Sequence, residues 1–88
     1  MMKTEQIIEI TNQCLQNNGL TNYKCQDVYN SIQQWNDKSE IRTIVDCYVY
    51  YDNGTMDCIQ FTIYKPQAAL KPSDIINTFQ HMMKMKQQ

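Results

Sequence analysis

Residues 44–64, IVDCYVYYDNGTMDCIQFTIY, are the stretch of this 88-residue chain that decides its fold. β-Branched and aromatic residues fill both ends of the stretch, and Asn53-Gly54 lies between them. Such a dipeptide between two strand-like runs is the strongest short-range signal for a β-hairpin, because both residues tolerate a positive φ. The stretch therefore predicts two antiparallel strands, and a two-residue loop would pair Asp52 with Thr55.

In that pairing neither face of the hairpin is polar, apart from Asp46 and Asp57. A hairpin with one solvated face alternates apolar with polar residues, so both faces are expected to be covered. A three-residue loop would shift the pairing but leave the alternation within each strand unchanged. One face is expected to carry Ile44, Tyr48, Ile59, Phe61 and Ile63, and the other Val45, Cys47, Val49, Tyr51, Met56, Cys58 and Tyr64.

Helical spacing of apolar residues predicts two helices before the hairpin. Residues 4–17 carry an apolar stripe, with Thr4 as N-cap and Gly19 as a stop signal. Residues 23–35 carry a second seam, whose members are three, four and three residues apart: Cys25, Val28, Ile32 and Trp35. The short loop between the two segments predicts an antiparallel helix pair, and residues 36–39 form a polar break.

A third helix is predicted after the hairpin. Pro-bounded residues 65–72 form a connector, and Ser73 is a good N-cap. Asp74 in the first turn and Lys84 and Lys86 in the last turn match the helix dipole. Residues 84–88 are expected to be a frayed tail.

The predicted fold is a single two-layer α+β domain over residues 1–88, in the order α-α-β-β-α, with an antiparallel hairpin packed against helices. A lone hairpin is marginal in water, and three helices can cover only one of its faces. We therefore expect a homodimer, in which a second copy completes the sheet at a strand edge or packs across a two-fold axis.

The four cysteines do not have metal-site spacing. Zinc sites use Cys or His pairs two to four residues apart, whereas the gaps here are eleven, twenty-two and eleven residues. We expect four free, half-buried thiols and neither metal nor cofactor. Two disulfide or redox pairs remain open alternatives, Cys47 with Cys58 on one hairpin face and Cys14 with Cys25 across the helix pair.

Other features argue against catalysis and against secretion. His81 is the only histidine, and Gly19 and Gly54 are the only glycines, so the sequence offers neither a nucleophile–base pair nor a phosphate loop. The first ten residues, MMKTEQIIEI, have no signal-peptide core, and no run reaches membrane-span length. We expect a non-enzymatic protein that is intracellular, in the cytoplasm.

The net charge of −1 argues against nonspecific binding to nucleic acid or anionic membranes. The favoured function is a non-catalytic protein-binding domain, an adaptor or inhibitor that docks on a larger protein, of a kind that a phage or mobile element could encode. One alternative is a nucleic-acid-binding or regulatory protein that uses the aromatic sheet and the basic C-terminal third, and another is a thiol-based redox or metal-binding protein. The predicted partner or dimer interface is Val45, Val49, Tyr51, Met56, Tyr64, Met82, Met83 and Met85.

Overall fold

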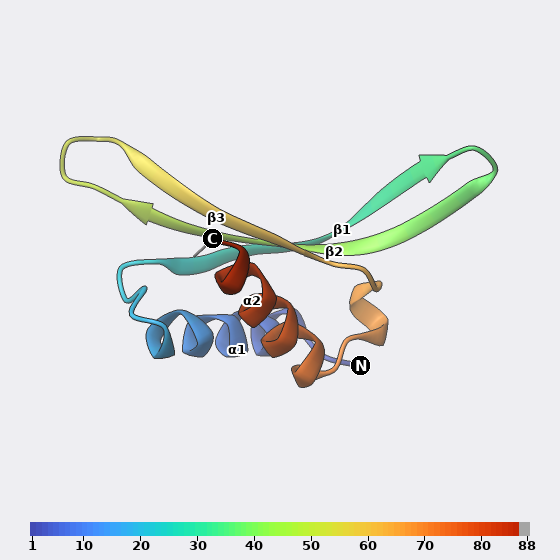
Figure 1. The fold of residues 1–88 in the computed structure, drawn as a ribbon, viewed down its shortest axis with the longest axis horizontal. Coiled ribbons are helices and arrows are strands. Elements are labelled where there is room, and N and C mark those ends of the chain that lie inside the picture. The colour runs from blue at the N-terminus through green and yellow to red at the C-terminus, as the bar shows by residue number, and fades with distance from the viewer. Residues whose placement is uncertain (87–88) are drawn as a thin grey trace.

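The computed structural model describes residues 1–86 as a small α+β protein with two helices and a three-stranded antiparallel sheet (Figure 1). The strands follow one another in the sheet in the order β1-β2-β3, and both helices lie on the same face of it (Figure 1). The elements are α1 (Thr4–Asn17), β1 (Lys24–Trp35), β2 (Lys38–Tyr50), β3 (Met56–Ile63), the 3-10 turn η1 (Gln67–Ala69) and α2 (Pro72–Lys86).

The α+β class is confirmed, but the predicted order is wrong, because the segment predicted as a second helix, residues 23–35, contains strand β1 instead. β1 pairs with β2 from Lys24↔Tyr48 to Trp35↔Lys38, around a two-residue loop in which Asn36 has a φ of 54°. The apolar spacing of β1 fits a helix, but its β-branched and aromatic residues also favour a strand. Without β1, the first half of β2 would have no partner in the sheet.

The β2–β3 hairpin is confirmed, with a three-residue loop. Tyr50 pairs with Met56, and the Tyr51 N–H donates to the Thr55 carbonyl oxygen (2.9 Å). Gly54 closes the turn at a φ of 84°, the left-handed conformation that such a loop requires after its type I turn. The assumed pairing of Asp52 with Thr55 is therefore wrong, and so are the faces that it assigned jointly to the two strands.

The face of the sheet that the helices cover holds most of the core. The additional loop residue brings alternate residues of β2 and β3 together on this face: Val45, Cys47, Val49, Ile59, Phe61 and Ile63, all buried. Ile7 and Leu15 of α1 pack against them, as do Ile75 and Phe79 of α2. The rings of Phe61 and Phe79 meet edge to face, with centroids 5.8 Å apart.

The sheet is longer than the helices that cover it. The 13 residues of β2 extend over roughly 43 Å, whereas the 14 residues of α1 rise by only about 21 Å. Both hairpin ends therefore project beyond the helices (Figure 1). Ile32 and Ile41, on the projecting β1–β2 hairpin, are 65% and 45% exposed.

The predicted bounds of the first helix are confirmed: it ends at Asn17, shortly before Gly19 with its positive φ, although Lys3 and not Thr4 is its N-cap. The last helix begins at Pro72, one residue before the expected cap Ser73. Its first turn is closed by Asp74, whose Oδ2 accepts the Lys71 N–H (2.9 Å). Of the predicted frayed tail, residues 84–86 belong to α2, and residues 87–88 lie outside the described part of the chain.

Candidate functional site: the β3–α2 groove

A groove with a volume of about 460 Å³ lies between the edge strand β3 and α2. On the helix side it is lined by residues spaced three, four and seven apart, which therefore lie on one face of α2: Thr78, His81, Met82 and Met85, followed by Lys86. On the sheet side it is lined by Gln60, Phe61, Thr62 and Tyr64. We call this feature the β3–α2 groove.

The backbone of β3 is open along this groove. β3 is the last strand of the sheet, so alternate N–H and C=O groups point away from β2 and towards no other described strand. β3 pairs with β2 without a break in register and contains no proline. Its geometry is therefore regular enough to accept another strand.

Arg42, which projects from the face of the sheet opposite the helices, holds the aromatic end of the groove. The guanidinium of Arg42 lies 4.6 Å from the ring centroid of Tyr64 and 5.2 Å from that of Trp35. Cation–π attraction between these groups holds the Tyr64 ring in place. Tyr64 is nevertheless 70% exposed, so most of its surface is available for contact with a partner.

The start of α2 is tied to the rest of the fold through the connector. Asp74 accepts hydrogen bonds from the Lys71 N–H (2.9 Å) and from Lys65 Nζ (3.0 Å), and these partners hold the pKa of the Asp74 carboxyl below its usual value. Thr43 Oγ1 donates to the Lys65 carbonyl oxygen (2.9 Å). Because Phe79 is also buried against Phe61, the helix wall of the groove is held at two points along its length.

The groove carries a single formal charge. Its lining residues include Lys86 but no aspartate or glutamate. Lys86 is exposed in the last turn of α2, on the same stretch of surface as Gln60 of β3. The groove therefore combines apolar side chains with a cationic end.

The face of the sheet opposite the helices is a second exposed surface (Figure 1). Some of its side chains contact one another: the rings of Tyr48 and Tyr50 stack with centroids 6.2 Å apart, and Gln60 Nε2 donates to Asp46 Oδ1 (2.7 Å). By the strand register its charged residues are equal in number and opposite in sign: Lys24, Lys38 and Arg42 against Asp27, Glu40 and Asp46. This face lacks the positive excess that nucleic-acid backbones attract.

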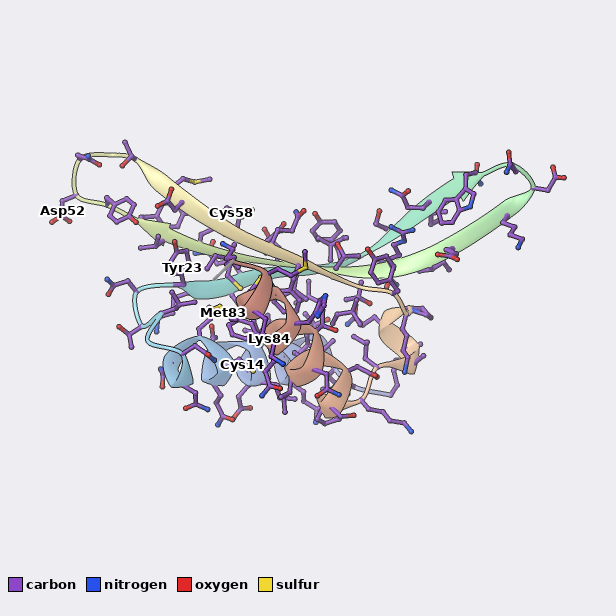
Figure 2. All side chains as sticks on the ribbon, in the orientation of Figure 1. Cys14, Tyr23, Asp52, Cys58, Met83 and Lys84 are labelled. Atoms are coloured by element: carbon purple, nitrogen blue, oxygen red, sulfur yellow. The ribbon has the colours of Figure 1, made fainter. Side chains whose placement is uncertain are left out.

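The cysteines are free thiols and are arranged differently from either predicted pair. Cys25 and Cys47 are direct partners across β1 and β2, and both are buried. Hydrogen bonding between the two thiols lowers the pKa of Cys25 and raises that of Cys47. Figure 2 shows Cys58 on β3 and Cys14 on α1, in different layers of the molecule.

The structure separates the predicted interface residues into three groups. Tyr64, Met82 and Met85 come together in the β3–α2 groove. Val45 and Val49 are buried in the core and are not available to a partner, and Met83, half-buried like Met82, packs against the core but does not line the groove. Tyr51 and Met56 lie near the exposed β2–β3 turn, where the Tyr51 hydroxyl donates to Asp57 Oδ2 (2.9 Å).

The sequence interpretation missed the polar residues of the groove. Thr78 and His81 share the helical spacing of Met82 and Met85, and this signal was available in the sequence. Gln60 and Thr62 could not have been assigned to the groove, because their position depends on β3 being an outer strand.

Neither of the two α-helices described in residues 1–86 is long and apolar enough to cross a membrane. In the same part of the chain, no group of three or more His, Cys, Asp or Glu side chains is placed to hold a metal ion. Comparisons with models of known protein families, with curated proteins and with solved structures gave no match for this chain.

Proposed function

We propose that this protein is a non-catalytic protein-binding domain, an adaptor or inhibitor that docks on a larger protein through the β3–α2 groove. The observation that carries the proposal is the position of an open sheet edge beside the exposed Met and Tyr side chains of the groove. Met85 is 62% exposed and Tyr64 is 70% exposed. Flexible methionine side chains are common on binding surfaces because they adapt to the shape of a partner.

The groove is favoured over the open face of the sheet for two reasons. It is concave, so a partner can bury apolar surface on both of its walls. Its strand edge is unpaired and Met85 is exposed, whereas on the open face Tyr48 stacks on Tyr50 and Gln60 is hydrogen-bonded to Asp46. A nucleic-acid partner is disfavoured because the charges of the open face are balanced.

Selection from a random displayed peptide library tests this proposal. Peptides selected on the wild-type protein should bind Met85→Asp at least about ten-fold more weakly, because a central apolar contact is replaced by a charge. Gln80→Asp is the matched control, since Gln80 is exposed on α2 outside the groove. The proposal fails if no peptide is enriched, or if both variants weaken binding equally.

A further inference from the structure

We propose that the β3–α2 groove takes an extended segment of a partner protein, which adds as a fourth strand beside β3 and places an acidic side chain near Lys86. This inference rests on the proposed function and specifies the conformation and the charge of the docked segment. Three features of the groove support it: the open backbone of β3, the single row of side chains on α2, and the sign of the charge.

The backbone feature favours an extended partner over a helical one. A strand added at a sheet edge pairs its N–H and C=O groups with those left open by the edge strand. β3 offers eight residues, a length of about 26 Å. The groove runs beside the second half of β3 and the following Tyr64. The side chains of roughly five partner residues would therefore contact the groove.

The row of side chains on α2 predicts the pattern of the docked segment. Successive side chains of a strand point to opposite faces of the sheet. Every second side chain of the added strand would therefore point towards the helix layer, where Met82 and Met85 form the wall of the groove. Apolar residues are expected at those alternate positions, because contact with the Met side chains removes apolar surface from water.

The sign of the charge predicts an acidic residue at one end of the segment. Lys86 lines the groove together with Gln60 of β3, and the groove lining includes no carboxylate that could pair with Lys86. A carboxylate side chain opposite the Cys58–Gln60 part of β3 would give Lys86 a partner of opposite charge.

Short strand-forming peptides provide the direct test. The probes are capped peptides of alternating valine and threonine with one glutamate, glutamine or lysine at either end, titrated into the 15N-labelled protein at low salt. The glutamate peptide should bind about two- to five-fold more tightly than the lysine peptide, as expected for an exposed ion pair, and added salt should reduce the difference. The amide shifts on binding should concentrate in β3 and α2.

Two charge reversals on α2 separate a local contact from an effect of net charge. Lys86→Glu should reverse the preference, so that the lysine peptide binds more tightly than the glutamate peptide. Lys84, labelled in Figure 2, is an exposed residue of the same helix that does not line the groove, so Lys84→Glu makes the same change in net charge and should leave the preference unchanged.

Each contrary result overturns a defined part of the inference. Equal affinity for the glutamate and lysine peptides, or equal effects of the two reversals, would overturn the acidic partner. Amide shifts confined to β1 or to the open face would overturn the strand added at β3. So would a dimer in the native mass spectrum together with β3 amides that are already protected from hydrogen exchange by the second copy. If library-selected peptides bind the groove but these strand peptides do not, this inference fails and the proposed function stands; if neither class binds, both fail.

Discussion

The two outer strands of the sheet, β1 and β3, make different contacts with the helices that cover one face of the sheet. α1 packs against β1, and its Asn12 Oδ1 accepts the Cys25 N–H of that strand (2.8 Å). The register of β1 is also interrupted by a bulge between Cys25 and Asp27. α2 packs against β3, but there it leaves a groove beside an unbroken edge.

This difference shows that one edge carries protection that the other lacks. Bulges and capped backbone groups are devices that keep edge strands from pairing with other chains. β1 carries both devices near its start, although Ile32 and Ile41 remain exposed at its far end. β3 carries neither of them, and an unprotected edge with an apolar groove beside it is the arrangement expected of a docking site.

The largest expected effect comes from removing the contact that holds α2 against β3. Phe79→Ala should lower the free energy of unfolding by about 3–5 kcal/mol, because the fully buried ring leaves a cavity against Phe61. Urea unfolding measures this change. Gln80→Ala, at the neighbouring exposed position, should change stability by less than about 0.5 kcal/mol. Similar small effects from both substitutions would show that α2 is not anchored through Phe79.

A smaller effect is expected at the protected edge. Asn12→Ala removes the acceptor of the Cys25 N–H and should cost about 1–2 kcal/mol, because a part-buried donor loses its partner. The Cys25 amide should also exchange with solvent faster in the variant, as measured by hydrogen-exchange NMR. Gln13→Ala, on the exposed face of α1, is the control. Unchanged exchange at Cys25 would mean that Asn12 does not protect this edge.

The first turn of α2 gives the stability of the protein a dependence on pH. The Lys71 N–H and then Lys65 lower the pKa of Asp74 in the folded state, so its contribution to stability is present above the unfolded value of about 4 and is lost as the pH falls below it. The wild type should therefore be more stable than Asp74→Asn at neutral pH, and the difference should shrink in acid. A difference that grows towards low pH in the unfolding curves would contradict the assignment.

The smallest effect concerns the thiols and leaves stability unchanged. Cys58 is exposed, whereas Cys14, Cys25 and Cys47 are buried, so a thiol reagent should label one site quickly and the others only after opening. Partial desolvation and then the nearby Asp46 charge raise the pKa of Cys58, so its labelling rate should still be rising above pH ~8.5. Rapid labelling of two or more thiols by mass spectrometry would contradict this arrangement.

The sequence alone predicts the helices and strands whose signals lie within a few neighbouring residues. The first helix, the β2–β3 hairpin and the last helix were all predicted, because Gly19, Asn53-Gly54 and the spacing of apolar residues act over a few residues. The helix predicted for residues 23–35 is wrong because a run with apolar residues three and four apart can fit either a helix or a strand. Pairing with β2, a tertiary contact, decides in favour of the strand.

The candidate site was only partly predictable for the same reason. Tyr64, Met82 and Met85 are among the predicted interface residues, and all three line the groove. Val45 and Val49 are buried because they lie on the face of the sheet that the helices cover, and the alternation within a strand does not show which of its two faces will be covered. The free edge of β3 could not be inferred until β1 was recognised as a strand on the other side of β2.

The most direct test of the account is hydrogen exchange along β1 and β3, measured with and without a saturating peptide selected on the wild-type protein. In the free protein, the outward-facing amides of β3 should exchange faster than the Cys25 amide of β1. Bound peptide should slow exchange at alternate amides between Met56 and Ile63 and leave β1 unchanged. Protection that appears on β1 or on the open face, while β3 stays as it was, would contradict the account.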